Sequence, residues 1–281
     1  MTPVPRTFEK ASPSATVSAT VTAARVPIGT EAILELPRSF LIRESSHRIL
    51  DPFTSEKLAT LGAALRMPTG ARVLDLACGK GELLCTWVRD HGVAGVGVDI
   101  SATFLAAAQA RAAELGVSDR IEFVHADAAG YVADEPVDVA ACLGATWIGR
   151  GTAGTIALLE RSLRPGGTVL IGERYWRLDP PDQDTVEGSY ARHKDELMSL
   201  PGLVENFRDL GWDLVEMVLA DQDSWDRYVA AQWLNIRRWI DANPDDELVG
   251  EMRAELDTAP LRHVRYQREY VGWGVFALAR R

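Results

Sequence analysis

The sequence predicts an α/β fold in which seven strands form a doubly wound, mostly parallel sheet. First, from Ala71 onward, short apolar segments alternate with amphipathic helical segments, as in sheets that are covered by helices on both faces. Second, a glycine-containing turn at residues 79–81 joins the first strand to the helix that follows it. Third, an acidic residue lies near the end of each of the first three strands: Asp75, Asp99 and Asp127.

The first four strands are short and rich in apolar residues, and the first is nearly all apolar, as expected for a strand buried on both faces. A helix over 81–90 follows the first strand. Ser101 is a suitable N-cap for the next helix, and Gly116 stands where a left-handed residue would end it. These four strands are predicted at residues 73–77, 95–100, 121–127 and 137–144.

The second half of the chain continues the alternation up to a long connection before the last strand. That connection, about residues 223–265, is rich in Trp and Arg, and we interpret it as a helical lid inserted into the fold. The strands predicted here are 167–176, 214–221 and 270–280. The helices predicted here are 152–163, 203–210, 224–242 and 246–256.

The N-terminal part divides into an arm and a helical entry to the main domain. Residues 1–35 are predicted to be a flexible arm, because small residues dominate and no helical period is visible. Residues 36–281 would form one domain. Within it, residues 38–66 are predicted to hold two short helices, broken at Asp51-Pro52 because proline disfavours helix in the residue before it.

Composition indicates an ordinary globular protein and argues against several partners. Of 281 residues, 47% are hydrophobic and 25% are charged, and the formal net charge is −10. Nucleic acid and anionic membrane surfaces both require clustered basic residues, so neither is the expected partner. The three cysteines match no zinc spacing and no metal site is predicted. A cytoplasmic location is expected, since no signal peptide or membrane-spanning segment is visible.

The glycine-containing loop indicates where a ligand binds, because open parallel sheets bind ligands outside the carboxyl ends of their strands. A dinucleotide would call for Gly-x-Gly-x-x-Gly, and Leu84 stands at the third glycine position. Asp75 would repel a pyrophosphate and would suit a cationic amino group. Asp99 follows the loop by about 20 residues, where an acidic side chain can bind ribose hydroxyls. With Asp127, the set matches a ligand that contains an amino acid, a ribose, an adenine and a sulfonium.

These features resemble the class I S-adenosylmethionine-dependent methyltransferases, which implies a Rossmann-like methyltransferase fold, S-adenosylmethionine as cofactor and methyl transfer as activity. The matching segments occur in order at 75–81, 99, 126–128 and 163–167. The chain is also similar to an uncharacterised bacterial subgroup of small-molecule methyltransferases. That closer likeness lies in residues 44–48, 144–147 and 172–176.

The resemblance implies that the methionine part of the cofactor lies on the glycine-containing loop. Asp75 would lie near its amino group, and Leu143 and Gly144 would line the cofactor near its sulfur. The loop residues whose backbone would face the methionine part are Ala77, Cys78, Gly79 and Gly81.

The resemblance also assigns the nucleoside part of the cofactor. Asp99 would hold the ribose hydroxyls, and Ile100 would pack on the adenine. Asp127, which follows Ala126, would accept a hydrogen bond from the adenine amine, and the Ala128 N–H would donate one to the ring.

A small, partly apolar acceptor is expected beside this cofactor. After the fourth strand the chain lacks the Asn/Asp-Pro-Pro-aromatic sequence of enzymes that methylate adenine or glutamine nitrogen. The candidates for a general base are His47, Glu173 and Tyr175. The candidates for acceptor contacts are Trp147, Trp176, Trp225 and Tyr228.

Two other functions remain open from the sequence. One is an NAD(P)-dependent oxidoreductase on a similar sheet, which Leu84 and Asp75 disfavour. The other is a protein that binds S-adenosylmethionine without catalysis. Binding of that molecule, together with transfer of its methyl group, would separate these alternatives from a methyltransferase.

Overall fold

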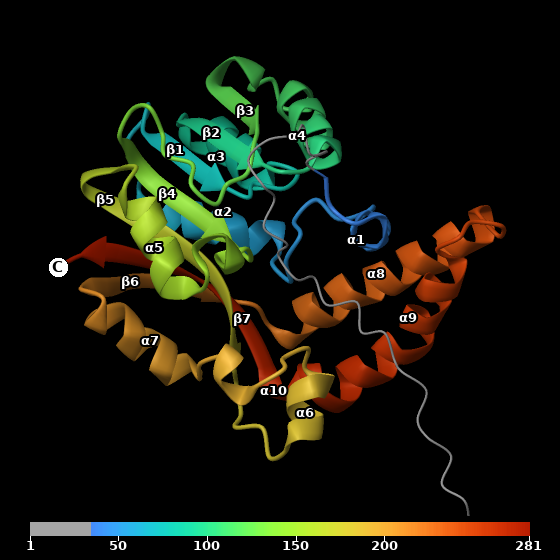
Figure 1. Cartoon of the computed structure of the whole chain (residues 1–281). Coiled ribbons are helices and arrows are strands. Elements are labelled where there is room, and N and C mark those ends of the chain that lie inside the picture. Colours follow the sequence, from blue (N-terminus) through green and yellow to red (C-terminus); the bar gives the residue numbers. More distant parts are fainter. Residues whose placement is uncertain (1–34) are drawn as a thin grey trace, which may run out of the picture. The chain divides into compact units, whose positions relative to one another are not determined.

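A seven-stranded sheet forms the centre of the protein, with the strand order β3-β2-β1-β4-β5-β7-β6 (Figure 1). The computed structural model describes residues 35–281. The strands are β1 (Arg72–Leu76), β2 (Ala94–Asp99), β3 (Ile121–His125), β4 (Val137–Leu143), β5 (Leu163–Trp176), β6 (Trp212–Leu219) and β7 (Val271–Arg280). The predicted seven-stranded α/β sheet is therefore confirmed.

Helices connect nearly all of these strands. The α-helices are α1 (Arg38–Arg43), α2 (Ser55–Leu65), α3 (Glu82–His91), α4 (Ala102–Glu114), α5 (Thr152–Glu160), α6 (Gln183–Gly188), α7 (Leu200–Asp209), α8 (Gln222–Ala242), α9 (Val249–Arg262) and α10 (Arg268–Tyr270). Short 3₁₀ helices are η1 (Ser118–Arg120), η2 (Thr146–Gly149) and η3 (Lys194–Glu196), and η4 (His263–Gln267) is a π-helix.

The topology creates one crevice at the carboxyl ends of the strands. Strands β1 to β5 pair in parallel, and β7 pairs antiparallel with both β5 and β6. The chain moves outward from β1 through β2 to β3 and then returns to place β4 on the other side of β1. Ligands of doubly wound sheets bind where the strand order reverses in this way, so the crevice between β1 and β4 is the expected site.

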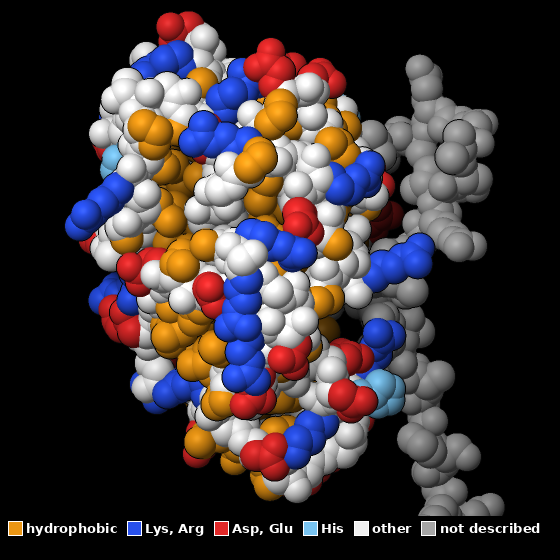
Figure 2. Space-filling view, turned by 90° about the vertical axis from the view of Figure 1, so that its left-hand side faces the viewer, with side chains coloured by type: hydrophobic (Ala, Val, Ile, Leu, Met, Phe, Trp, Pro, Cys, Tyr) orange, Lys and Arg blue, Asp and Glu red, His pale blue; other side chains and the backbone are white. Residues whose placement is uncertain are grey.

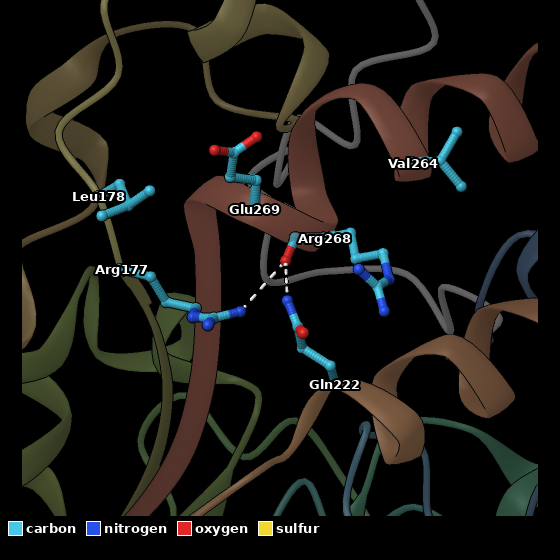
Figure 3. Close-up of a pocket in the computed structure, with 6 residues that line it drawn as sticks. All are labelled: Arg177, Leu178, Gln222, Val264, Arg268 and Glu269. Atoms are coloured by element: carbon cyan, nitrogen blue, oxygen red, sulfur yellow. Dashed lines mark hydrogen bonds between the residues drawn. The ribbon is translucent and has the colours of Figure 1, made fainter.

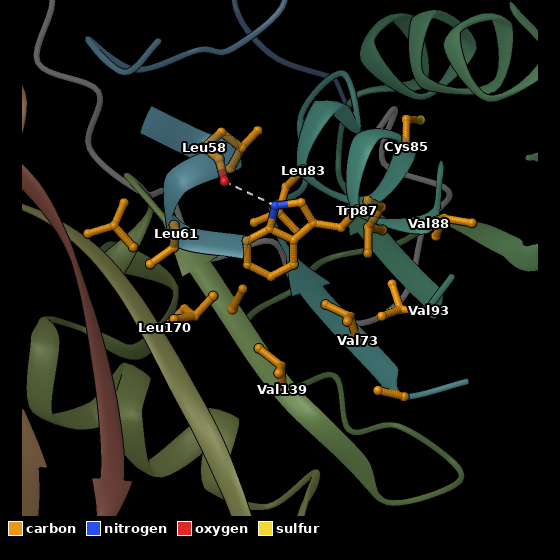
Figure 4. Packing of buried hydrophobic residues seen from close by; sticks show 14 of the residues in the cluster. Leu58, Leu61, Val73, Leu83, Cys85, Trp87, Val88, Val93, Val139 and Leu170 are labelled. Atoms are coloured by element: carbon orange, nitrogen blue, oxygen red, sulfur yellow. Dashed lines mark hydrogen bonds between the residues drawn. The ribbon is translucent and has the colours of Figure 1, made fainter. Parts of the chain in front are cut away.

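Hydrophobic cores on both faces hold the sheet. On one face, α2 and α3 pack on the sheet around Trp87, whose indole N–H donates to the carbonyl of Leu58 at 3.2 Å (Figure 4). On the other face, α5 and α7 pack on the sheet through residues such as Leu159 and Phe207. The first helix after β2 begins as predicted, since the Ser101 hydroxyl accepts from the Phe104 N–H at 3.2 Å.

Two helices, α8 and α9, form the connection before β7 and lie side by side (Figure 1). They occupy the segment for which a helical lid is predicted. Residues 177–199, to which the sequence analysis assigned no element, hold α6 and η3. The predicted N-terminal arm, apart from Glu35, lies outside the described residues. Within residues 35–281, no helix has both the length and the apolar character needed to cross a membrane.

Candidate functional site

The glycine-containing loop after β1 has an unusual backbone conformation. Ala77, Gly79 and Gly81 all have left-handed φ angles, of 58°, 54° and 69°. A Cβ atom at Gly81 would lie 2.9 Å from both the Ala108 Cβ and the Phe123 ring, so the loop packs too closely for a side chain there. Ala77 is a non-glycine residue in this region, which costs about 1 kcal/mol or more and is typical of functional loops.

Several predicted cofactor residues come together in one pocket beside this loop. Asp75, Ala77, Cys78, Gly79 and Leu143 all line it. The residues that complete the lining come mainly from the segment before α2, from α2 and α3, and from β7: Arg48, Ile49, Leu50, Asp51, Phe53, Leu58, Lys80, Glu82, Leu83 and Trp273.

Two of the three predicted strand-end carboxylates are buried in this region. Burial, together with the nearby carboxylates of Asp99 and Asp51, raises the pKa of Asp75 to about 8. No side-chain hydrogen bond satisfies Asp75 among the described residues. Asp99 accepts from the N–H groups of Gly79 and Ser101, each at 2.8 Å, and burial raises its pKa as well.

Unliganded protein should be more stable at lower pH over the range from about 9 to about 6. Because the pKa values of Asp75 and Asp51 are raised to about 8 and about 7, the folded state holds protons that the unfolded state has released, and this stabilisation is lost as pH rises through those values. Asp75→Asn should flatten the pH profile and exceed the wild type in free energy of unfolding at about pH 9. Urea unfolding across this range measures both effects, and stability that increases with pH would contradict the assignment.

The third strand-end carboxylate, Asp127, has a different environment. Its side chain is exposed and accepts from the Ala129 N–H at 2.8 Å, which closes a local turn. Ala128 is buried, and Ala126 and Ile100 are half-buried. The proposed adenine contacts of these residues stay predictions.

Lys80, in the middle of the glycine-containing loop, was not predicted to have a role. Its ammonium group donates to the carbonyls of Glu44, Ser45 and His47 at 2.7, 3.2 and 2.7 Å. The side chain is buried, and burial lowers its pKa. Lys80 thereby fixes the segment after α1 against the glycine-containing loop. This segment, residues 44–53, forms one wall of the pocket.

A polar cluster connects this wall to α8. The buried carboxylate of Glu44 accepts from Gln232 at 2.6 Å and lies 2.9 Å from the Tyr228 hydroxyl, which is also 2.8 Å from the Leu50 carbonyl. The His47 ring packs on Tyr228 with a centroid distance of 4.5 Å. Its Nδ1 is 3.0 Å from Glu44, and its buried Nε2 has no partner within the described chain. The predicted residues His47 and Tyr228 are therefore in contact.

Glu173, a predicted general base near the end of β5, forms hydrogen bonds within the protein. Its carboxylate accepts from the Thr146 hydroxyl at 2.5 Å, the Thr152 hydroxyl at 3.2 Å and the Arg174 N–H at 2.8 Å. These bonds fix η2 and the start of α5 to the end of β5. Both oxygens of the Glu173 carboxylate are thus occupied by hydrogen bonds within the protein.

The predicted aromatic residues are distributed over different environments. Tyr175 is buried in the core on the α7 face, with its ring 6.5 Å from that of Phe276. Trp176 is buried against residues of the segment 177–199, such as Val186 and Leu197, and its indole N–H donates to the Lys194 carbonyl at 2.7 Å. Neither ring is among the residues that line the pocket beside the glycine-containing loop. Trp147 is 64% exposed, and Trp225 is half-buried between two hydrophobic clusters.

A separate hollow lies near the start of β7 (Figure 3). Both Arg177 and Gln222 donate there to the backbone carbonyl of Arg268, at 3.1 and 2.9 Å. Their polar groups thus stabilise α10. None of the predicted cofactor residues lines this hollow, so the pocket beside the glycine-containing loop is the better candidate site.

Asp51 is, with Lys80, a residue of this pocket that sequence reasoning missed, since it was interpreted only as part of a helix break. Its carboxyl lies against Gly144, where an added Cβ would be 2.1 Å from Oδ1. Burial raises its pKa to about 7, with Glu44 and Glu173 adding to the effect. The available signal was a single acidic residue among apolar neighbours, Ile49 and Leu50 before it and Phe53 after it.

Comparison with known proteins identifies the family of the chain. Residues 73–167 match the family described as "Methyltransferase domain". The chain is 58% identical over 248 residues to the uncharacterised protein YjhP of Escherichia coli K12, covering 88% of this chain and 100% of YjhP.

Solved structures give the same result. A S-adenosylmethionine-dependent methyltransferase from Geobacter sulfurreducens, crystallised with S-adenosylhomocysteine, is 60% identical with a TM-score of 0.87. A counterpart from Thiobacillus denitrificans in the same complex is 58% identical with a TM-score of 0.86. In both cases the match covers 88% of this chain and 100% of the other. The chain therefore belongs to the class I S-adenosylmethionine-dependent methyltransferases, which leaves the NAD(P)-dependent alternative without support.

Proposed function

We propose that this enzyme transfers a methyl group from S-adenosylmethionine to a small-molecule acceptor by in-line displacement. The observation that carries the proposal is the pocket between the glycine-containing loop, residues 48–53 and α2, in which the carboxyl groups of Asp75 and Asp51 have no partner among residues 35–281. Asp75 is buried and Asp51 is half-buried. Carboxyl groups that are withdrawn from water without a partner are costly, and a cationic ligand would satisfy them.

The residues present fit the cofactor. Asp75 would bind the amino group of the methionine part, and the backbone of residues 77–81 would lie along it. Asp99 would accept from the ribose hydroxyls, because each carboxylate oxygen can accept a further bond beyond those from Gly79 and Ser101. When bound, S-adenosylmethionine supplies a methyl group on a positively charged sulfur.

The chain's own contribution to the reaction is mainly alignment and exclusion of water. Helix α8 is connected to the pocket wall through Tyr228 and Gln232, which both contact the buried Glu44 carboxylate. We assign to α8 and α9 the role of a cover over the acceptor. None of the three candidates lines the pocket beside the glycine-containing loop. We assign the role of proton acceptor to His47, because its Nε2 has no partner within the described chain and the next residue, Arg48, lines the pocket.

The charge distribution supports a small acceptor over nucleic acid. On the face shown in Figure 2, basic side chains are interspersed with acidic and hydrophobic ones, and the described residues form no continuous basic surface there. The formal net charge of −10 has the same implication.

Incubation with S-adenosylmethionine that carries a radiolabelled methyl group tests this proposal. The panel would contain a fractionated small-metabolite extract, total RNA, DNA and denatured protein, each with wild-type enzyme and with Asp99→Ala. We expect label in the small-metabolite fraction with the wild type, and none with Asp99→Ala. Label confined to RNA, DNA or protein would contradict the small-molecule acceptor, and binding without transfer to any fraction would favour a protein that only binds the cofactor.

A further inference from the structure

Asp51 occupies a position in the pocket that nothing else in the fold requires to be acidic. It lines the same pocket as Asp75 and Leu143, and its Oδ1 lies against the backbone of Gly144 at the end of β4. In the part of the chain that the structure describes, its carboxyl makes no hydrogen bond and no ion pair. An acidic group placed there without a partner suggests a ligand of positive charge.

The groups that face Asp51 make its neighbourhood negative. Asp75 on β1, Glu173 on β5 and Glu44 after α1 all act on it or are affected by it electrostatically. Tyr228 on α8 and Cys142 on β4 feel its charge as well.

The two cations that line the pocket are already engaged. The Lys80 ammonium is held by three backbone carbonyls. Arg48, which is half exposed, pairs with Glu114 at 3.4 Å. Within the described residues, no basic side chain therefore compensates Asp51.

We propose that Asp51 recognises the charge on the cofactor's sulfur: the carboxyl is ionised when a sulfonium lies in the pocket and protonated when a neutral thioether does. This inference rests on the proposed function and on the position of Leu143 and Gly144 near the sulfur, which the family resemblance implies. S-Adenosylmethionine and S-adenosylhomocysteine both carry the charged amino group that Asp75 would bind, so Asp75 treats them alike. Asp51 separates them, which favours binding of the methyl donor and release of the spent cofactor.

The raised pKa of Asp51, about 7, makes the effect measurable near neutral pH. About half of the free protein carries the proton at pH 7, so binding of the sulfonium should release roughly half a proton and binding of the thioether should take up roughly half a proton. The two ligands should therefore differ by up to about one proton. The ratio of the two affinities should increase with pH between about 6 and 8, by about tenfold for each unit by which the sulfonium lowers the pKa of Asp51.

Calorimetric titration tests this directly. Wild type, Asp51→Asn and Asp75→Asn are titrated with each ligand at pH 7 in phosphate and in Tris, whose ionisation enthalpies differ, so that the heat difference gives the protons released. We expect the wild type to release more protons with S-adenosylmethionine. Asp51→Asn should bind both ligands with equal proton release. Asp75→Asn, the matched control, should lose affinity for both ligands and keep the difference between them.

A difference in proton release that survives in Asp51→Asn would overturn the proposal, as would a wild-type affinity ratio that is constant from about pH 6 to 8. The second measurement needs no variant, so it holds even if Asp51→Asn folds poorly. Wild-type protein that binds neither ligand would contradict the proposed function itself, which distinguishes the two failures.

Discussion

Replacing Asp99 by alanine should lower the affinity for S-adenosylmethionine by at least about 100-fold. The carboxylate accepts from the N–H groups of Gly79 and Ser101, and we expect it to accept from the ribose hydroxyls in addition. Each hydrogen bond to a charged group contributes about 1.5–3 kcal/mol, so the loss of two bonds to the ribose accounts for an effect of this size. Isothermal titration calorimetry with the methyl donor measures it.

Asp119→Ala is the matched control for this experiment. Asp119 is exposed in η1, which precedes β3 and therefore lies at the opposite end of the sheet from the carboxyl edge. Its replacement should change the affinity less than about twofold, because surface substitutions away from a site usually have effects below about 0.5 kcal/mol. If Asp99→Ala bound the donor as tightly as the wild type, the ribose assignment would be wrong.

Replacing Trp87 by alanine should cost about 3–5 kcal/mol of unfolding free energy, the range measured for large aromatic residues in cores. Trp87 is 1% exposed, fills the space between α2 and the sheet, and donates to the Leu58 carbonyl (Figure 4). The substitution leaves a cavity and removes the hydrogen bond to the Leu58 carbonyl. Urea unfolding measures the loss, and the midpoint of thermal unfolding should fall by about 10 °C.

Two further variants give the control for that result. Trp147→Ala removes a side chain that is 64% exposed and should change the free energy of unfolding by less than about 0.5 kcal/mol. Trp87→Phe keeps most of the apolar volume and should fall between the wild type and Trp87→Ala. Equal stabilities for Trp87→Ala and Trp147→Ala would show that this core cluster does not hold α2 to the sheet.

Much of the fold could be predicted because strands and helices of the central sheet carry strong local signals. Buried parallel strands are nearly continuous apolar runs, and Ser101 and Gly116 mark the ends of one helix. Residues 177–199 could not be predicted in the same way. Their helices, α6 and η3, have only six and three residues, which is too short for a hydrophobic period to appear.

The candidate site was predicted in part for a similar reason. Asp75 lies on the strand that leads into a recognisable loop, and Asp99 ends the next strand of the sheet. Their positions in the sequence therefore imply that both lie near this loop in space. The side chains of Glu173 and Tyr175 lie on one face of β5 and that of Trp176 lies on the other. Since residues on both faces are buried or half-buried there, no local pattern indicates which face meets the pocket. Asp51 was missed because its importance arises from contact with Gly144, which is distant in sequence.

The contacts of Lys80 have a consequence for how this protein tolerates substitution. The ammonium group binds main-chain oxygens, which every amino acid provides, and so it does not depend on the identity of the residues that it holds. The exposed Ser45 can therefore diverge between relatives while the segment keeps its position. Substitution of Lys80 would remove all three of these attachments at once and leave the segment held only from the side of α8.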